Sequence, residues 1–274
     1  MFITRLLSGI VLVIWIIGVC LLGGYPLAGT LLLFSLVAFY ELCKAMGVKK
    51  PGEKNPLVIF GYISIVLYYV LLAVTDDLQL LVMVASFSVI IFLCIYVFTF
   101  PKFRVEEIAS VIFAYFYAPI MLSFVSLTRE LSDGKHIVWM ILISSWGFDT
   151  CAYCIGMLTG KTIGNHKFLP KLSPKKSIEG VIGGIVGAGA LAYVYGNIFM
   201  PDVKWFLCAI AAIGGIIAQI GDLAASAIKR NKDIKDYGKC IPGHGGVMDR
   251  FDSVIFTAPI TYFLAVLWIV AKGM

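Results

Sequence analysis

Charged residues are scarce in this chain of 274 residues. Asp, Glu, Lys and Arg together make up only 14% of the sequence, whereas 60% of the residues are hydrophobic. A soluble globular domain usually carries about 25% charged residues. The composition therefore excludes a soluble domain and indicates a membrane protein.

Motifs of several protein classes are also missing. The seven cysteines are an odd number and mostly lie inside apolar segments, which excludes the disulfide framework of a small secreted protein. There is no Walker A sequence and no Gly-x-Ser-x-Gly motif, so neither a P-loop nor the nucleophile turn of a serine hydrolase is expected. The apolar run at the N-terminus lacks a small-residue cleavage site, so we read it as a retained helix.

Long apolar runs, by contrast, recur nine times along the chain. Each contains about 18–24 residues, enough to cross ~30 Å of hydrocarbon as a helix. The runs cover approximately residues 6–23, 25–43, 57–74, 78–100, 108–127, 137–159, 178–200, 205–228 and 254–271. The predicted fold class is all-α, a polytopic membrane protein with about nine transmembrane helices. We expect one integral membrane domain, residues 1–274, without internal repeats.

The positions of lysine and arginine predict the orientation of these helices. Cytoplasmic loops of membrane proteins are enriched in both residues. With the N-terminus in the cytoplasm and the C-terminus outside, only four of the 22 basic residues fall on the outer side. These four are Arg129, Lys135, Lys204 and Lys272. The net charge of +6 therefore reflects orientation, and we expect no nucleic-acid partner.

Charge is most concentrated in residues 226–252, which hold six of the 22 basic residues and four of the 16 acids. The run from Pro242 to Gly246 offers backbone N–H groups that side chains do not obstruct, so they can approach phosphate oxygens. Asp249 and Asp252 supply hard oxygen ligands of the kind Mg²⁺ prefers. Basic counter-charges for a polyanion surround them: Lys229, Arg230, Lys235, Lys239 and Arg250. The pattern indicates a nucleotide or polyphosphate site at a membrane surface.

Two acidic residues lie inside apolar runs. Asp222 shares one face of the eighth predicted helix with Gln219, Ser226 and Lys229, because these residues are three or four positions apart. Asp149 lies in the sixth predicted helix. An ionisable group within the bilayer costs roughly 3 kcal/mol on insertion scales, and it usually faces a cavity or a partner. We interpret Asp222 as a metal ligand, with a helix-packing hydrogen bond as the alternative.

The loop before the seventh predicted helix is also basic. It contains Ser173, Lys175 and Lys176 just before the helix begins, and Glu179 one turn into it. Lysines near a membrane surface often serve only orientation or contact anionic lipid. Adjacent lysines beside hydroxyl groups at a helix N-terminus also make a good phosphate receptor. We favour the phosphate receptor for Lys175 and Lys176.

The segment 226–252 resembles the signature of phosphatidate cytidylyltransferases, or CDP-diacylglycerol synthases. The matching positions are Ser226, Lys229, Arg230, Lys235, Asp236, Gly238, Pro242, His244, Gly245, Gly246, Asp249, Arg250 and Asp252. A second stretch is similar to another motif of the same family through Trp146, Asp149, Tyr153, Gly156, Ser173, Pro174, Lys175, Lys176, Glu179 and Gly180. The family often has Thr-Trp where this chain has Ser177-Ile178. Residues 1–135 are similar only as a series of apolar spans, and we read them as largely plain lipid-facing helix.

The resemblance implies that CTP and phosphatidic acid react to give CDP-diacylglycerol and pyrophosphate, in phospholipid biosynthesis. Residues 136–274 would then be the catalytic half, with both basic loops in the cytoplasm. We expect the bacterial cytoplasmic membrane as the location, with the active site facing the cytoplasm. Small-residue faces such as Gly183-Gly184-x-x-Gly187 would allow a homodimer.

We also assign roles to the candidate residues as a hypothesis. The expected cofactor is Mg²⁺, with a second metal ion that is divalent or monovalent. Its ligands would be Asp222, Asp249 and Asp252. The catalytic group would comprise Asp222, Asp249, Lys229, Arg230 and Arg250. The substrate-binding group would comprise Asp149, Ser173, Lys175, Lys176, Ser226, Lys235, His244, Gly245 and Gly246.

Three alternatives remain open at this stage. A related lipid kinase would use CTP to phosphorylate a polyprenol-type alcohol and would release CDP instead of pyrophosphate. An ion-coupled transporter would use Asp149 and Asp222 to line an ion path, although transporters commonly show repeated halves. A zinc site would need Cys151, Cys154, Cys240 and His244 as ligands.

Overall fold

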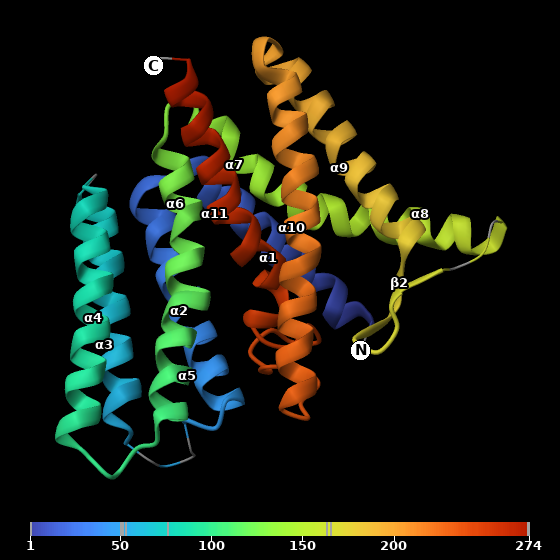
Figure 1. Cartoon of the computed structure of the whole chain (residues 1–274). Helices are drawn as coiled ribbons and strands as arrows, with labels where there is room; N and C mark the ends of the chain where they lie inside the picture. Colours follow the sequence, from blue (N-terminus) through green and yellow to red (C-terminus); the bar gives the residue numbers. More distant parts are fainter. Residues whose placement is uncertain are drawn as a thin grey trace. The chain divides into compact units, whose positions relative to one another are not determined.

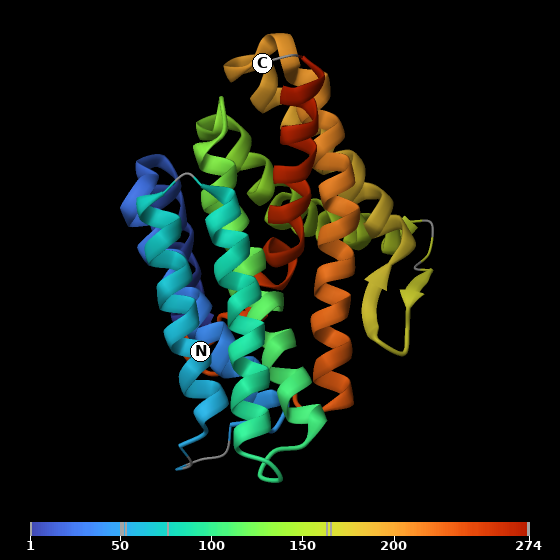
Figure 2. The same cartoon turned by 60° about the vertical axis from the view of Figure 1, so that its left-hand side comes forward.

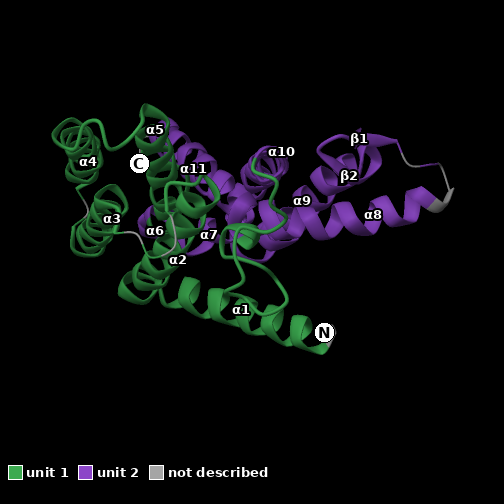
Figure 3. Cartoon of the chain, turned by 90° about the horizontal axis from the view of Figure 1, so that it is seen from below, with its two compact units in different colours: residues 1–126, 232–250 green, residues 127–231, 251–274 purple. Residues whose placement is uncertain are grey.

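The computed structural model describes residues 2–49, 52, 54–75, 77–162, 164 and 166–272 of the chain. Within these residues, nine helical segments are long and apolar enough to cross a membrane. The prediction of an all-α polytopic membrane protein is therefore confirmed. The chain divides into two compact units (Figure 3). Unit 1 comprises residues 1–126 and 232–250, and unit 2 comprises residues 127–231 and 251–274.

Unit 1 is built from the amino-terminal helices. They are α1 (Phe2–Leu22), α2 (Gly24–Ala45), α3 (Pro56–Val74), α4 (Leu78–Phe98), α5 (Val105–Tyr115), the π-helical turn η1 (Phe116–Ile120) and most of α6 (Met121–Glu130). Helices α3 and α4 lie side by side, and α2 packs against α3 (Figures 1 and 2). Residues 232–250, called the signature loop below, complete this unit. They end in the first residues of α11 (Met248–Ala271).

Proline and tyrosine explain the π-helical turn in the fifth span. Pro119 lies inside η1 and has no N–H to donate, so the regular i→i−4 ladder is interrupted there. The carbonyl of Pro119 accepts a hydrogen bond from the Tyr69 hydroxyl at 2.9 Å, and that hydroxyl also bonds Ser35 at 2.8 Å. These buried contacts link α2, α3 and η1 without leaving the polar groups unsatisfied.

Unit 2 contains the remaining helices and a small hairpin. Its elements are α7 (Gly134–Leu142), the π-helical turn η2 (Ile143–Gly147), α8 (Phe148–Thr162), β1 (Lys167–Leu169), β2 (Ser173–Ser177), α9 (Ile178–Phe199), η3 (Pro201–Val203), α10 (Lys204–Asn231) and most of α11. Helix α9 packs along both α8 and α10. The hairpin follows α8 and leads directly into α9 (Figure 2).

Glycines bring α9 unusually close to α8. A Cβ atom at Gly183 would lie 2.5 Å from Ile155, and one at Gly187 would lie 2.5 Å from Cys151. The small-residue stripe singled out in the sequence therefore packs inside the chain, as close helix approach in membranes requires. The homodimer that this stripe allows stays a prediction.

The hairpin is the main addition to what the sequence predicted. Strands β1 and β2 pair antiparallel, with Lys167 opposite Ser177 and Leu169 opposite Ser173. Ser177 then caps α9, because its hydroxyl accepts the N–H of Gly180 at 3.1 Å. Lys175 and Lys176 thus belong to an ordered strand that ends at the N-terminus of α9.

Candidate active site

Acidic side chains from three helices of unit 2 come together. Asp149 lies in the first turn of α8, Asp222 in α10 and Asp252 in α11. Asp252 is only 7% exposed and lies within electrostatic range of Asp222, Asp149 and Lys229. Lys176 of β2 forms an ion pair with Asp222. The structure therefore brings together five of the proposed site residues, which come from the four elements α8, β2, α10 and α11.

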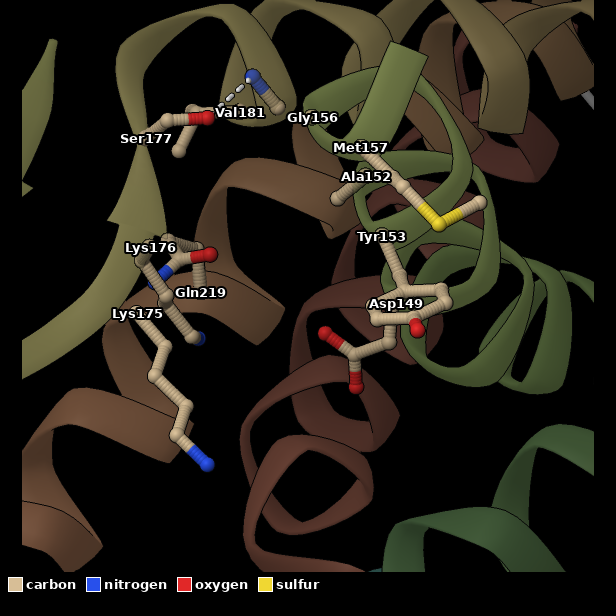
Figure 4. A pocket seen from close by; sticks show the side chains of 11 residues that line it. Asp149, Ala152, Tyr153, Gly156, Met157, Lys175, Lys176, Ser177, Val181 and Gln219 are labelled. Carbon is tan, nitrogen blue, oxygen red and sulfur yellow. Dashed lines mark hydrogen bonds between the residues drawn. The ribbon is translucent and has the colours of Figure 1, made fainter. Parts of the chain in front are cut away.

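A pocket of about 310 Å³ lies beside this acidic group, between α8, β2, α9 and α10. One part of it is polar and includes Asp149, Lys175, Lys176 and Gln219 (Figure 4). The rest is lined mostly by small or apolar side chains, with the Ser177 hydroxyl and Tyr153 beside them: Ala152, Gly156, Met157, Gly180 and Val181. A pocket with a polar end that carries two lysines and a largely apolar remainder suits a ligand that carries both a phosphate and hydrocarbon.

Gln219 is a pocket residue to which the sequence analysis gave no role. It is 4% exposed and lies one turn before Asp222 in α10. Its Nε2 group has no hydrogen-bond partner among the residues that the structure describes. A buried amide donor without a partner is costly, so a ligand oxygen in the pocket would satisfy it.

The remaining candidates of unit 2 lie on the same elements. Ser226 follows Asp222 by one turn of α10, and Lys229 follows Ser226 by another. Lys229 is partly buried, whereas Arg230 at the end of the helix is exposed. Ser173 lies at the start of β2, two residues before Lys175.

The acidic group fits a divalent cation that also binds a substrate. Three neighbouring carboxylates repel one another, and burial of Asp252 strengthens that repulsion. Within the described ranges, no three His, Cys, Asp or Glu side chains lie close enough to hold a metal ion by themselves. Mg²⁺ does not need such a cage, because it usually binds one or two carboxylates together with substrate phosphates and water. The same finding gives the zinc alternative no support.

The signature loop in unit 1 is held in shape by its own carboxylate. The N–H groups of Gly246 and Tyr237 both donate to Oδ2 of Asp249, at 3.0 and 2.9 Å. Ile241 and Gly245 form an isolated β-bridge, and Gly245 has a φ of +88°, which favours glycine. Asp249, a proposed metal ligand, therefore also orders the loop from which it projects.

These bonds change the role expected for the backbone of the signature loop. The sequence suggested that N–H groups between Pro242 and Gly246 would bind phosphate oxygens. In the structure His244 donates its N–H to the Ile241 carbonyl at 2.9 Å, and Gly246 donates to Asp249. These two N–H groups therefore shape the loop, and phosphate binding by the other N–H groups of this run stays a prediction.

His244 is placed by α1 and by cations of the same unit. Its Nδ1 atom lies 2.9 Å from the Ser8 hydroxyl, and its carbonyl accepts the Arg250 Nε–H at 2.9 Å. Partial burial, and then the positive charges of Arg250 and Arg5, lower the pKa of His244. The imidazole is therefore neutral near pH 7 and supports the loop as an uncharged group.

Comparison with known proteins decides the family. Residues 3–268 match the Cytidylyltransferase family. The chain belongs to this family. It is 30% identical over 271 residues to a phosphatidate cytidylyltransferase of Bacillus subtilis (strain 168), covering 96% of this chain and 97% of the relative. It is 32% identical over 268 residues to a protein of the same name from Staphylococcus haemolyticus (strain JCSC1435), covering 96% and 98%.

Membership of the cytidylyltransferase family confirms the resemblance drawn from the two motifs. The match extends over the amino-terminal helices, which the sequence analysis had compared with the family only as apolar spans. Those helices contain a residue that sequence reasoning missed. Glu41 in α2 is 2% exposed and contacts the signature loop. Its only sequence signal was an acid near the end of an apolar run.

Proposed function

We propose that this chain transfers the cytidylyl group of CTP to phosphatidate, forming CDP-diacylglycerol and releasing pyrophosphate. Relatives that are called phosphatidate cytidylyltransferase match 96% of this chain. The structural observation that carries the proposal is the pocket of unit 2. Its polar end with two lysines and its largely apolar remainder match the two halves of a phosphorylated lipid.

The reaction is a direct displacement at phosphorus. A phosphate oxygen of phosphatidate bonds to the α-phosphorus of CTP, and the bond from that phosphorus to the bridging oxygen of the β-phosphate breaks. The electron pair leaves with pyrophosphate. The nucleophile is already anionic and needs no strong base. The obstacles are repulsion between two polyanions and charge on the leaving group, both of which fixed cations reduce.

We assign the pocket to the lipid substrate. Lys175 and Lys176 would bind the phosphate of phosphatidate, and Gln219 would donate to one of its oxygens. The small side chains of Gly156 and Gly180 would leave room for the glycerol and the first part of an acyl chain. Gly156, Gly180 and Gln219 lie on helices that are long and apolar enough to cross the membrane, so the lipid would reach the pocket from the bilayer.

The acidic residues would hold Mg²⁺, together with a second cation that is divalent or monovalent. In unit 2, Asp222 and Asp252 are the proposed metal ligands, and Asp149 would orient them. In unit 1, Asp249 of the signature loop is the third proposed ligand. When bound, the metal offsets phosphate charge in the transition state. Lys176 pairs with Asp222 and would move to a substrate phosphate when a cation takes over that carboxylate.

The other signature residues would act on phosphate groups. Lys229, Arg230 and Arg250 are proposed to neutralise the triphosphate and the leaving pyrophosphate. Ser173, Ser226 and Lys235 would donate hydrogen bonds. His244, Gly245 and Gly246 would shape the loop. We place the protein in the bacterial cytoplasmic membrane with these residues facing the cytoplasm, where CTP is made.

Labelled CTP tests the proposed reaction. Purified protein is incubated with phosphatidate and CTP labelled at the α- or the γ-phosphate, with Mg²⁺ or with EDTA. The α-label should enter the lipid fraction and the γ-label should leave as pyrophosphate, only when Mg²⁺ is present. Transfer of the γ-label to lipid would instead show a lipid kinase. Product formation in EDTA would refute the metal requirement.

A further inference from the structure

Glu41 is a buried acid in the half of the chain that the sequence suggested was plain helix. Its carboxyl group lies in the last two turns of α2 and contacts the signature loop, some 200 residues later. Oε1 accepts the Val247 N–H at 3.2 Å, and Oε2 accepts the Met248 N–H at 2.9 Å. All of these residues belong to unit 1.

The two N–H groups lie at the beginning of α11. The first N–H groups of a helix have no partner within the helix, and the helix dipole is positive there. A carboxylate in this position accepts hydrogen bonds from two of these N–H groups, and its negative charge interacts favourably with the helix dipole. Glu41 thus occupies, from within the protein, a place that suits an anion.

Two glycines of the signature make room for this carboxyl group. A Cβ atom at Gly238 or at Gly246 would overlap with the Glu41 carboxyl oxygens. Cys240 also points at Oε1, with its Sγ atom 3.4 Å away. Glycine at positions 238 and 246 is therefore explained by the approach of Glu41.

The contact continues to the proposed metal ligand. The N–H of Gly246, next to Val247, donates to Asp249, and Asp249 lies in the same first turn of α11 as Met248. Val247 and Met248 are the two residues between Gly246 and Asp249, so Glu41 fixes the backbone that the Gly246–Asp249 bond closes.

We propose that Glu41 is a positioning residue, which holds the start of α11 so that Asp249 and the signature loop keep their active geometry. This role rests on the proposed cytidylyl transfer. Glu41 itself would touch neither substrate nor metal.

The central test compares Glu41→Gln with Glu106→Gln. The carboxamide keeps one acceptor oxygen and places an NH₂ group against a backbone N–H, so the contact is broken with little change in volume. Glu106 is an exposed acid in the first turn of α5, in the same unit, and serves as the matched control.

Hydrogen exchange of the purified protein without substrate gives the first measurement. Glu41→Gln should speed amide exchange in peptides that cover residues 237–250 by at least about tenfold, while peptides of α3 and α4 stay unchanged. This result does not depend on the reaction, so it separates failure of the Glu41 proposal from failure of the proposed function. Unchanged exchange in residues 237–250 would overturn the proposal.

Kinetics give the second measurement. The Gln variant should need several-fold more Mg²⁺ for half-maximal rate and show a raised KM for CTP, whereas Glu106→Gln should match the wild type. A lower rate with unchanged KM and unchanged Mg²⁺ requirement would mean fewer folded molecules and would overturn the positioning role.

Should Glu41→Gln fail to fold, Gly238→Ala decides the question. Its methyl group displaces the Glu41 carboxyl group without removing it, and the same rise in Mg²⁺ requirement is expected. Wild-type behaviour of Gly238→Ala would overturn the proposal.

Discussion

Replacing Asp252 by asparagine should separate stability from activity. Asp252 is 7% exposed and lies near two other carboxylates, Asp222 and Asp149, with Lys229 acting on it as a counter-charge. A buried charge in this setting destabilises the folded chain. Asparagine has nearly the same shape and keeps an oxygen for the Ser253 N–H, which lies 2.8 Å from Oδ1.

The expected gain in stability follows from this balance. Removing a buried charge from beside two like charges stabilises a fold by an amount on the order of 1–4 kcal/mol. Loss of the attraction to Lys229 offsets part of that gain here, so we expect about 1–2 kcal/mol. A change of this size raises the melting temperature by about 2–8 °C in a domain of this size. Activity should fall by at least about 100-fold, because a group placed to stabilise phosphate charge is lost.

The assay pairs two measurements on the same detergent-purified samples. The apparent melting temperature is read from the loss of the monodisperse size-exclusion peak, and CDP-diacylglycerol formation is measured with saturating CTP and Mg²⁺. Asp202→Asn is the matched control, since Asp202 is exposed in η3 of the same unit, and it should change neither quantity. Loss of both stability and activity in Asp252→Asn would show a structural role and refute the reasoning. Wild-type activity would remove Asp252 from the site.

Three further perturbations test other parts of the account. Asp249→Asn should abolish product formation while expression and membrane insertion persist, and most of the activity surviving in detergent with Mg²⁺ would refute the ligand assignment. Gln219→Leu should raise the KM for phosphatidate about tenfold, as loss of one hydrogen bond to a charged group predicts, and leave the KM for CTP unchanged; equal changes in both would contradict the lipid assignment. His244 has a lowered pKa in the folded chain, so the unfolded chain takes up this proton at higher pH. The free energy of unfolding should therefore fall as the pH drops through about 6.5 and level off below the folded-state pKa. His244→Gln should remove this pH-dependent fall in the free energy of unfolding, measured by acid denaturation. An unchanged dependence on pH would refute the contribution of His244.

Much of the helical architecture could be predicted because hydropathy is a local property. A span needs a long run of apolar residues, and the runs in the sequence match the helices to within several residues. The π-helical turn at Pro119 and the hairpin of β1 and β2 were not predicted. The π-helical turn depends on a partner elsewhere in the fold, since the Tyr69 hydroxyl bonds the Pro119 carbonyl.

The acidic group of unit 2 was predictable for a different reason. Asp149 and Asp222 are ionisable groups inside apolar runs, and the cost of placing them there points to partners. Lys176 of β2 pairs with Asp222, and Asp252 of α11 lies near both acids, as the basic loop and the signature had suggested. The convergence of Asp222 with Asp249 stays a prediction.

Glu41 shows where sequence reasoning stopped. It stands near the end of an apolar helix, beside Lys44, and such acids usually face water at the membrane surface. Its contacts with Val247 and Met248 join positions more than 200 residues apart, which no local pattern records. The glycines at 238 and 246 fit the signature, but their physical reason became visible only with Glu41 beside them.

Binding of CTP to the substrate-free protein tests the central claim most directly. Calorimetric titration of CTP with Mg²⁺ into the wild type and into Asp222→Asn measures affinity without any turnover. The account predicts that the wild type binds CTP only when Mg²⁺ is present, and that Asp222→Asn binds at least about tenfold more weakly. Equal affinity of the two proteins, or equal affinity with and without Mg²⁺, would contradict it.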